Sequence, residues 1–151
     1  MGAVDRVLGR LINENLVPQE CLEGCSEDEI QEVMADQGVA RLPAEYVSYL
    51  KRIGKGAGPY LRGTDTFYPR IITIGIRSAA SDLFRENDTE IQLTPDSFVF
   101  AMHQGYQVFW FPTVMDDDPK VMMYQEGDKA PCREWDRFSD YLNSMIKEIE
   151  H

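Results

Sequence analysis

Asp116, Asp117 and Asp118 are three consecutive carboxylates that could hold a divalent cation, since hard cations prefer clustered oxygen ligands. The spacing of an EF-hand loop is absent, because no glycine stands at its sixth place and no glutamate at its twelfth. A solvated turn between two strands is therefore the favoured interpretation, and we expect no metal site. The turn has no evident local role, so its carboxylates are candidates for contact with a basic partner.

The glycine-rich residues 54–59 (Gly-Lys-Gly-Ala-Gly-Pro) invite comparison with a phosphate-binding loop. The comparison fails, because no Gly-Lys-Ser/Thr ending is present and no strand directly precedes the run. Pro59 also stands where the following helix should begin. We expect an irregular segment that ends a helix and turns the chain.

The cysteines and histidines do not form a recognisable catalytic or metal-binding pattern. Cys21 and Cys25 have no second Cys/His pair at zinc-site spacing, and Cys132 has no evident base beside it. His103, at the end of an expected strand, favours a hydrogen-bonded structural role over that of a general base, and His151 is the last residue. Paired carboxylates remain an open alternative, because the sequence does not say which acids share a cleft. We expect no enzyme activity and no cofactor.

The chain carries 26 Asp and Glu residues against 15 Lys and Arg, which gives a formal net charge of −11. Nucleic-acid-binding proteins need positive charge to displace the counterions of phosphates, so this balance argues against that role and against anionic membranes. It favours solubility and rapid encounter with a basic partner. The sequence leaves open which of these two purposes the acidity serves.

Length and apolar patterning predict one domain, residues 1–151, in the cytoplasm. The 151 residues are within the usual size of a single domain. Charged residues interrupt the apolar pattern of residues 1–16, so no secretory leader is expected. No apolar run approaches the roughly 20 residues of a membrane-spanning helix, and the cysteines are too few for a disulfide scaffold.

Helices are expected before and after a group of strands. Residues 4–12 show helical spacing, and Ser26 to Glu29 has the form of a capping box for a helix that ends at Gly38. Pro43 is expected in the first position of a third helix, which ends at Gly54. One or two helical turns are expected over residues 78–85, and a last helix carries Trp135, Phe138, Leu142, Met145, Ile146 and Ile149.

Strands are expected where β-branched and aromatic residues gather: residues 70–76, 97–103, 106–111 and 120–125. Gln104-Gly105 should form the tight turn of a hairpin. Because strands follow one another rather than alternating with helices, the fold class is α+β. We expect a largely antiparallel sheet of about four to six strands, with N-terminal helices and a C-terminal helix packed on it.

Several segments together resemble the SUKH superfamily of Smi/Knr-type proteins. Residues 24–30, residues 39–46 with their Leu-Pro-x-x-Tyr pattern, and Tyr49-Leu50 resemble its opening signature. Residues 53–56 stand where many members carry an Asn-Gly-Gly-like turn, so this chain departs from the pattern there. The central hairpin, an aspartate-rich turn and an aromatic-led closing helix follow in the family's order, and the resemblance covers residues 22–142.

The resemblance implies a non-catalytic protein-binding domain of the SUKH-like α+β fold. Bacterial members are viewed as immunity proteins that neutralise polymorphic toxins, often nucleases or deaminases, by direct binding. A regulatory or scaffold protein, the role of fungal members, is the alternative, and a small-ligand-binding domain or enzyme is the second alternative. An acidic inhibitor of a basic toxin would need apolar anchors inside its charged rim, and the candidates are Tyr60, Phe67, Tyr68, Tyr106 and Trp110, the last of which could equally be core.

Overall fold

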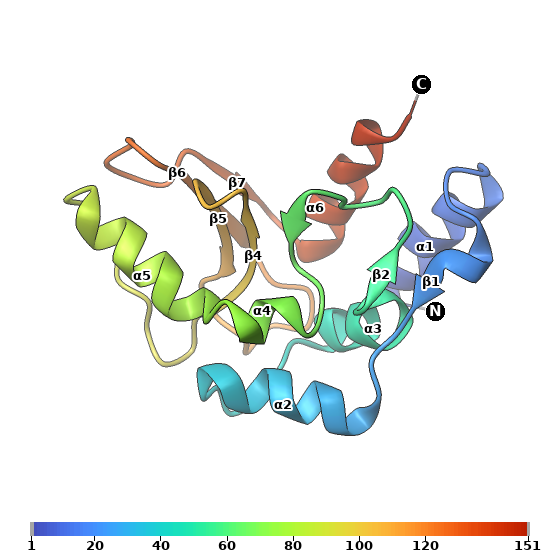
Figure 1. The fold of residues 1–151 in the computed structure, drawn as a ribbon, viewed down its shortest axis with the longest axis horizontal. Helices are drawn as coiled ribbons and strands as arrows, with labels where there is room; N and C mark the ends of the chain where they lie inside the picture. Colours follow the sequence, from blue (N-terminus) through green and yellow to red (C-terminus); the bar gives the residue numbers. More distant parts are fainter. Residues whose placement is uncertain (1, 151) are drawn as a thin grey trace.

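Residues 2–150 are described by the computed structural model (Figure 1). The helices are α1 (Ala3–Asn13), α2 (Glu27–Gln37), α3 (Ala44–Ile53), α4 (Arg70–Thr73), α5 (Ile76–Glu86) and α6 (Phe138–Met145), with short 3-10 turns η1 (Gln19–Cys21) and η2 (Ile146–Glu148). The strands are β1 (Leu22–Glu23), β2 (Gly56–Ala57), β3 (Thr64–Asp65), β4 (Phe98–His103), β5 (Gln107–Phe111), β6 (Val121–Gln125) and β7 (Arg133–Trp135). No helix in this range is both long enough and apolar enough to cross a membrane.

The main sheet is antiparallel throughout and has the strand order β3-β4-β5-β6-β7, while β1 and β2 form a separate two-stranded sheet. Gln104 and Gly105, which join β4 to β5, have φ angles of 51° and 78°, the left-handed conformation that a tight hairpin turn requires. The fold is α+β, as the sequence predicts, with helices at both ends of the chain around the sheet.

Aromatic side chains fill the space between the sheet and the helices α3 and α6. The Tyr46 ring lies 5.2–5.7 Å, between ring centroids, from those of Phe98, Phe111 and Phe138. On the opposite face of the sheet, Phe84 of α5 packs edge-on against Trp110 at 5.3 Å. Trp110 is therefore a core residue, which decides between the two roles that its sequence position allowed.

The first half of β4 has no β3 residue beside it, because β3 pairs only with Met102 and His103. The side chain of Gln37, at the end of α2, takes that place. Its amide donates to the Val99 carbonyl at 2.6 Å and accepts from the Val99 N–H at 2.9 Å. A single side chain thereby satisfies a stretch of sheet edge that would otherwise be free to pair with another chain.

The expected helix ends are confirmed at α2. Ser26 Oγ accepts from the Glu29 N–H, and the Glu29 carboxylate accepts from the Ser26 N–H, so the capping box is complete. Gly38 has φ 68°, the left-handed cap expected there. Pro43 is one residue outside its predicted place: it has an extended ψ of 141° and precedes α3.

Three predictions of secondary structure are wrong. Residues 70–76 form α4 and the start of α5 instead of a strand, and Gly75, with φ 58°, separates the two helices. Ile71 and Ile76 are buried in the core in this helical conformation, so tertiary packing overrides the β propensity of the segment. Trp135 lies in β7, before the last helix, and residues 54–59 contain β2.

Candidate binding cleft

Two of the three aspartates in the predicted contact turn have structural roles, which corrects the expectation that the turn had none. Asp117 forms an ion pair with Arg41 at 2.7 Å, and its carbonyl accepts from the Glu45 N–H at 2.9 Å. Asp118 accepts from the N–H and the hydroxyl of Ser139 in the first turn of α6. Asp116 is exposed.

Tyr60 does not lie at the surface. Its side chain is 0% exposed, and its hydroxyl donates to the Leu142 carbonyl at 2.6 Å. It is a core residue that ties the β2–β3 connection to α6, so it is withdrawn as an anchor for a partner.

Tyr106 lies at the end of the sheet opposite the aspartate turn. It directly precedes β5, whereas the turn follows it, and five strand residues span about 17 Å. The Tyr106 ring packs edge-on against His103, 5.8 Å between centroids, and His103 Nδ1 is 3.0 Å from Thr64 Oγ1. The hydrogen bond of His103 is the kind of contact that the sequence predicts for it.

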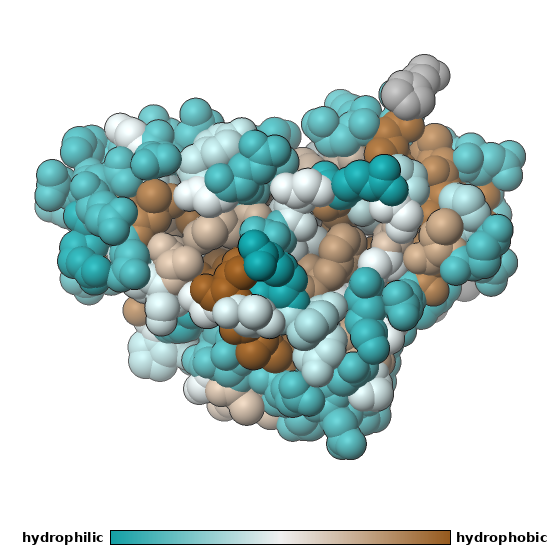
Figure 2. Space-filling view, in the orientation of Figure 1, coloured by the Kyte–Doolittle hydropathy of each residue, from teal (hydrophilic) through white to brown (hydrophobic). Residues whose placement is uncertain are grey.

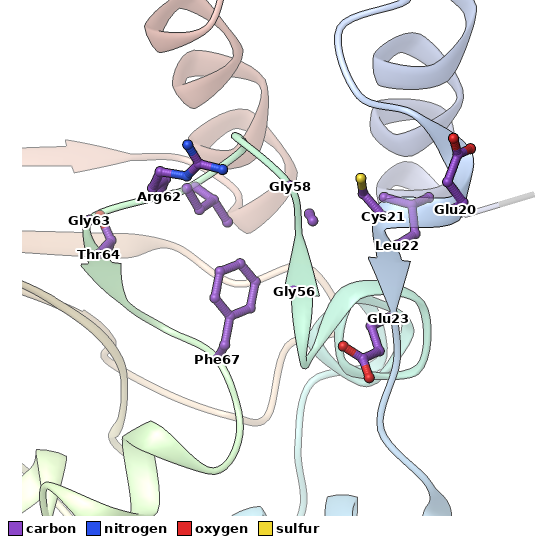
Figure 3. Close-up of a pocket in the computed structure, with 12 residues that line it drawn as sticks. Glu20, Cys21, Leu22, Glu23, Gly56, Gly58, Arg62, Gly63, Thr64 and Phe67 are labelled. Carbon is purple, nitrogen blue, oxygen red and sulfur yellow. The ribbon is translucent and has the colours of Figure 1, made fainter.

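Phe67 lines a cleft of about 730 Å³ between the small sheet and the start of β3 (Figure 3). One wall is formed by β1, β2 and Gly58, and the other by residues 61–64. Figure 3 shows the Phe67 ring and the Arg62 side chain in the gap between these walls. The ring is half-buried, so part of it is available from the cleft.

The cleft has an acidic wall opposite Arg62. Glu20 and Glu23 line it, together with the exposed thiol of Cys21. Sequence reasoning missed these residues, because β1 and β2 have two residues each and leave no detectable strand pattern. Their position could have been found only from the folded chain.

Glycines allow the small sheet to lie close to α3. A Cβ at Gly24 would lie 1.8 Å from the Lys51 carbonyl oxygen, and one at Gly54 would lie 2.5 Å from the Leu50 carbonyl oxygen. The Lys55 N–H donates to the Glu23 carbonyl at 2.8 Å, and the Tyr68 N–H donates to the Gly54 carbonyl at 2.8 Å. These contacts place β1, β2 and the Phe67-Tyr68 segment side by side.

Tyr68 connects the cleft to the acidic helix α2. Its hydroxyl donates to the Glu32 carboxylate at 3.0 Å, and Lys55 Nζ lies 5.9 Å from the centre of its ring. Lys55 also binds Glu29 at 3.0 Å. The pKa of Glu29 is lowered, first by the hydrogen bond from the Ser26 backbone and then by Lys55, so this carboxylate remains charged.

Apolar residues continue from the cleft onto α4. Figure 2 shows hydrophobic residues over α4 near the middle of this side of the molecule, with strongly hydrophilic residues directly beside them. We call the combined surface the Phe67 face. It has an apolar centre, formed by Phe67, Tyr68, Ile72 and Ile74. Its rim carries both charges, since Glu20, Glu23 and Glu32 lie there with Arg62, Lys55 and Arg70.

Within residues 2–150, no group of three or more His, Cys, Asp or Glu side chains is arranged to hold a metal ion. The three cysteines are free thiols. Burial raises the pKa of the Cys25 thiol to about 11, which leaves it protonated near neutral pH. His151 lies outside the described residues.

The helices, the antiparallel sheet and the closing helix define an α+β domain with a cleft between its two sheets. The model of the SMI1 / KNR4 family (SUKH-1) matches residues 24–144, so the chain belongs to this family. The resemblance read from residues 22–142 is thereby confirmed. None of the curated proteins compared with the chain matches it.

Proposed function

We propose that this protein is a non-catalytic, cytoplasmic immunity-type protein that neutralises a toxin domain by binding it through the Phe67 face. Family membership supports the general role, since bacterial SUKH proteins are viewed as immunity proteins. The observation that carries the proposal is the half-buried Phe67 in a cleft with an acidic wall, on a chain of net charge −11. Tight interfaces combine a desolvated apolar anchor with a polar rim in this way.

Electrostatics favours a basic partner such as a nuclease. Such a toxin has a cationic, phosphate-seeking surface, and the rim carboxylates Glu20, Glu23 and Glu32 would accelerate its encounter. Exposed ion pairs alone contribute little free energy, so the affinity itself must come from the apolar centre. Phe67 and the neighbouring α4 residues supply that centre.

Co-expression with toxin domains encoded beside the gene tests this proposal. The wild-type protein should restore growth, and Phe67→Ala should lose protection because interface aromatics commonly contribute about 2 kcal/mol or more. Met115→Ala is the matched control, an exposed apolar residue of the β5–β6 connection that does not line the cleft, and it should still protect. Protection from none of the neighbouring toxins would overturn the proposal.

The second candidate function is a regulatory or scaffold protein, the role that fungal family members suggest. It uses the same apolar face but predicts a stable complex with a housekeeping protein and no toxin gene nearby. Pull-down with the wild-type protein and with Phe67→Ala separates the two functions, because it identifies the partner that depends on Phe67.

A further inference from the structure

A second cleft, of about 490 Å³, lies between the main sheet and the C-terminal helical segment. Each strand from β3 to β7 contributes to it. The register pairs Thr64 with His103, His103 with Gln107, and Met123 with Arg133, so these side chains share one face of the sheet. The opposite wall comes from α6 and the residues that follow it, including Tyr141.

Three aromatic rings form one apolar wall of this cleft. Trp135 lies 5.1 Å from Tyr141 and 6.2 Å from Phe109, and Phe109 lies 5.4 Å from Tyr141, all between ring centroids. Met123 and Met145 extend the wall. Methionine adapts its shape to irregular ligands, and aromatic rings provide flat contact area.

The polar part of the cleft is cationic, in contrast to the protein as a whole. Arg62 and Arg133 both line it, and Glu148 is the one carboxylate among its described residues. Arg133 lies over the Trp135 ring, 4.3 Å from its centre. Several other arginines are paired with aspartates, as in Arg41–Asp117, Arg52–Asp5 and Arg70–Asp65.

Neither Arg62 nor Arg133 forms an ion pair with a carboxylate among residues 2–150. A guanidinium that lies beside an apolar wall and has no carboxylate partner can donate hydrogen bonds to an oxyanion. In an acidic chain, two such groups on one cleft indicate a ligand of negative charge.

Trp135 has a further unmet requirement. Its indole Nε1–H is buried and has no hydrogen-bond acceptor in the described structure, a condition shared only with the hydroxyl of Tyr46 in that range. Buried donors normally have partners, so each exception needs an explanation. The nitrogen is closed off from the cleft, so its N–H signal reports on the aromatic wall and is not itself a contact for a ligand.

We propose that this cleft binds a small organic anion in which an aromatic body carries a carboxylate. The body would pack against Phe109, Trp135 and Tyr141, and the carboxylate would bind Arg62 and Arg133. The cleft is within the range of about 300–1,000 Å³ typical of small-molecule sites. This site adjoins the Phe67 face, because Leu61, Arg62 and Thr64 border both clefts, but its aromatic wall is not part of that face.

NMR titration of the isotope-labelled protein with indole-3-acetate tests the proposal, and indole-3-acetamide is the neutral control. The acid should shift the indole N–H signal of Trp135, assigned with Trp135→Phe, and should bind at least tenfold more tightly than the amide. Equal affinity of acid and amide, or no binding of either, would overturn the proposal.

Charge variants identify the cationic groups. Arg133→Gln should weaken binding of the acid at least tenfold. Since Arg133 stacks on Trp135, Arg62→Gln is a second variant that leaves the wall intact, and it should also weaken binding. Lys147→Gln is the matched control, a cation of η2 that does not line the cleft, and should change nothing.

A tripeptide with a free C-terminal carboxylate and a terminal tryptophan separates a small molecule from a protein terminus. Binding of this peptide more tightly than indole-3-acetate would show that the occupant is a protein, and the proposal would be wrong. Toxin protection is measured separately with Phe67→Ala, so failure at one cleft does not decide the other.

Discussion

Asp118 accepts two hydrogen bonds from Ser139, at 2.9 Å from its N–H and at 2.6 Å from its hydroxyl. A residue 21 positions earlier in the chain therefore satisfies a free donor in the first turn of α6. The carboxylate also lies at the positive end of that helix. The β5–β6 connection thus fixes the start of the last helix.

Asp118→Ala should lower the free energy of unfolding by about 1–2 kcal/mol, because it removes both hydrogen bonds and leaves donors without partners. Urea denaturation followed by circular dichroism measures the change. Asp116→Ala, at the exposed neighbour, should stay within about 0.5 kcal/mol of the wild type. Equal effects of the two substitutions would contradict the assigned role of Asp118.

Tyr60→Phe should destabilise the protein by about 1–2 kcal/mol, since it leaves the buried Leu142 carbonyl without its short hydrogen bond. Tyr68→Phe removes an exposed hydroxyl–carboxylate contact and should cost less than about 0.5 kcal/mol. Thermal and chemical unfolding of both variants provide the comparison. A larger loss of stability for Tyr68→Phe than for Tyr60→Phe would contradict the prediction.

Gly24→Ala should destabilise the fold by more than about 3 kcal/mol or prevent folding, because the new methyl group would collide with the Lys51 carbonyl. Gly9→Ala is its control. Nothing lies within 4 Å of a Cβ at Gly9, and alanine in a helix is favoured by roughly 0.5–1 kcal/mol, so this variant should be more stable. Soluble yield and melting temperature report both effects.

Glu29 should make part of the stability dependent on pH. Its folded pKa lies below the ordinary value of 4.5, so its contribution to stability is present above that value and is lost as pH falls through the folded pKa. Glu29→Gln should therefore lower stability at pH 7 and show a smaller further loss on acidification. Urea unfolding at pH 7 and pH 3 measures this, with the exposed Glu90→Gln as control. An unchanged pH dependence would contradict the prediction.

Cys25 should resist alkylation in the native protein, because burial raises its pKa to about 11 and covers its thiol. Iodoacetamide at pH 8 should modify the exposed Cys21 first and Cys25 only after denaturation. Mass spectrometry of peptides gives the order of labelling. Labelling of native Cys25 as fast as Cys21 would contradict the burial of this thiol.

Local sequence signals predicted the parts of the fold whose cause is local. Ser26 and Glu29 form their capping box within one helical turn, and Gln104-Gly105 turns the chain within two residues. The strand prediction for residues 70–76 was wrong. Their β-branched side chains are typical of strands, but in the folded chain the segment packs on the core as helix. The two-residue strands depend on partners far along the chain and leave no pattern.

The candidate site was predictable only in part. Phe67 and Tyr68 stood out as aromatics in an irregular segment, but Glu20, Glu23 and Arg62 joined Phe67 through pairing that no local pattern encodes. Asp118 looked free because its partner, Ser139, is distant in sequence. Tyr60 looked available because burial is a property of the folded chain.

The family match begins at Gly24, but α1 lies before it and belongs to the same core. Val4, Leu8 and Leu11 are fully buried, and α1 packs on α3 and α6. A recombinant fragment limited to residues 24–144 would therefore expose the apolar surfaces of α3 and α6 that α1 covers, and it should aggregate. The segment that matches the family is therefore shorter than the segment that must be present for the core to form.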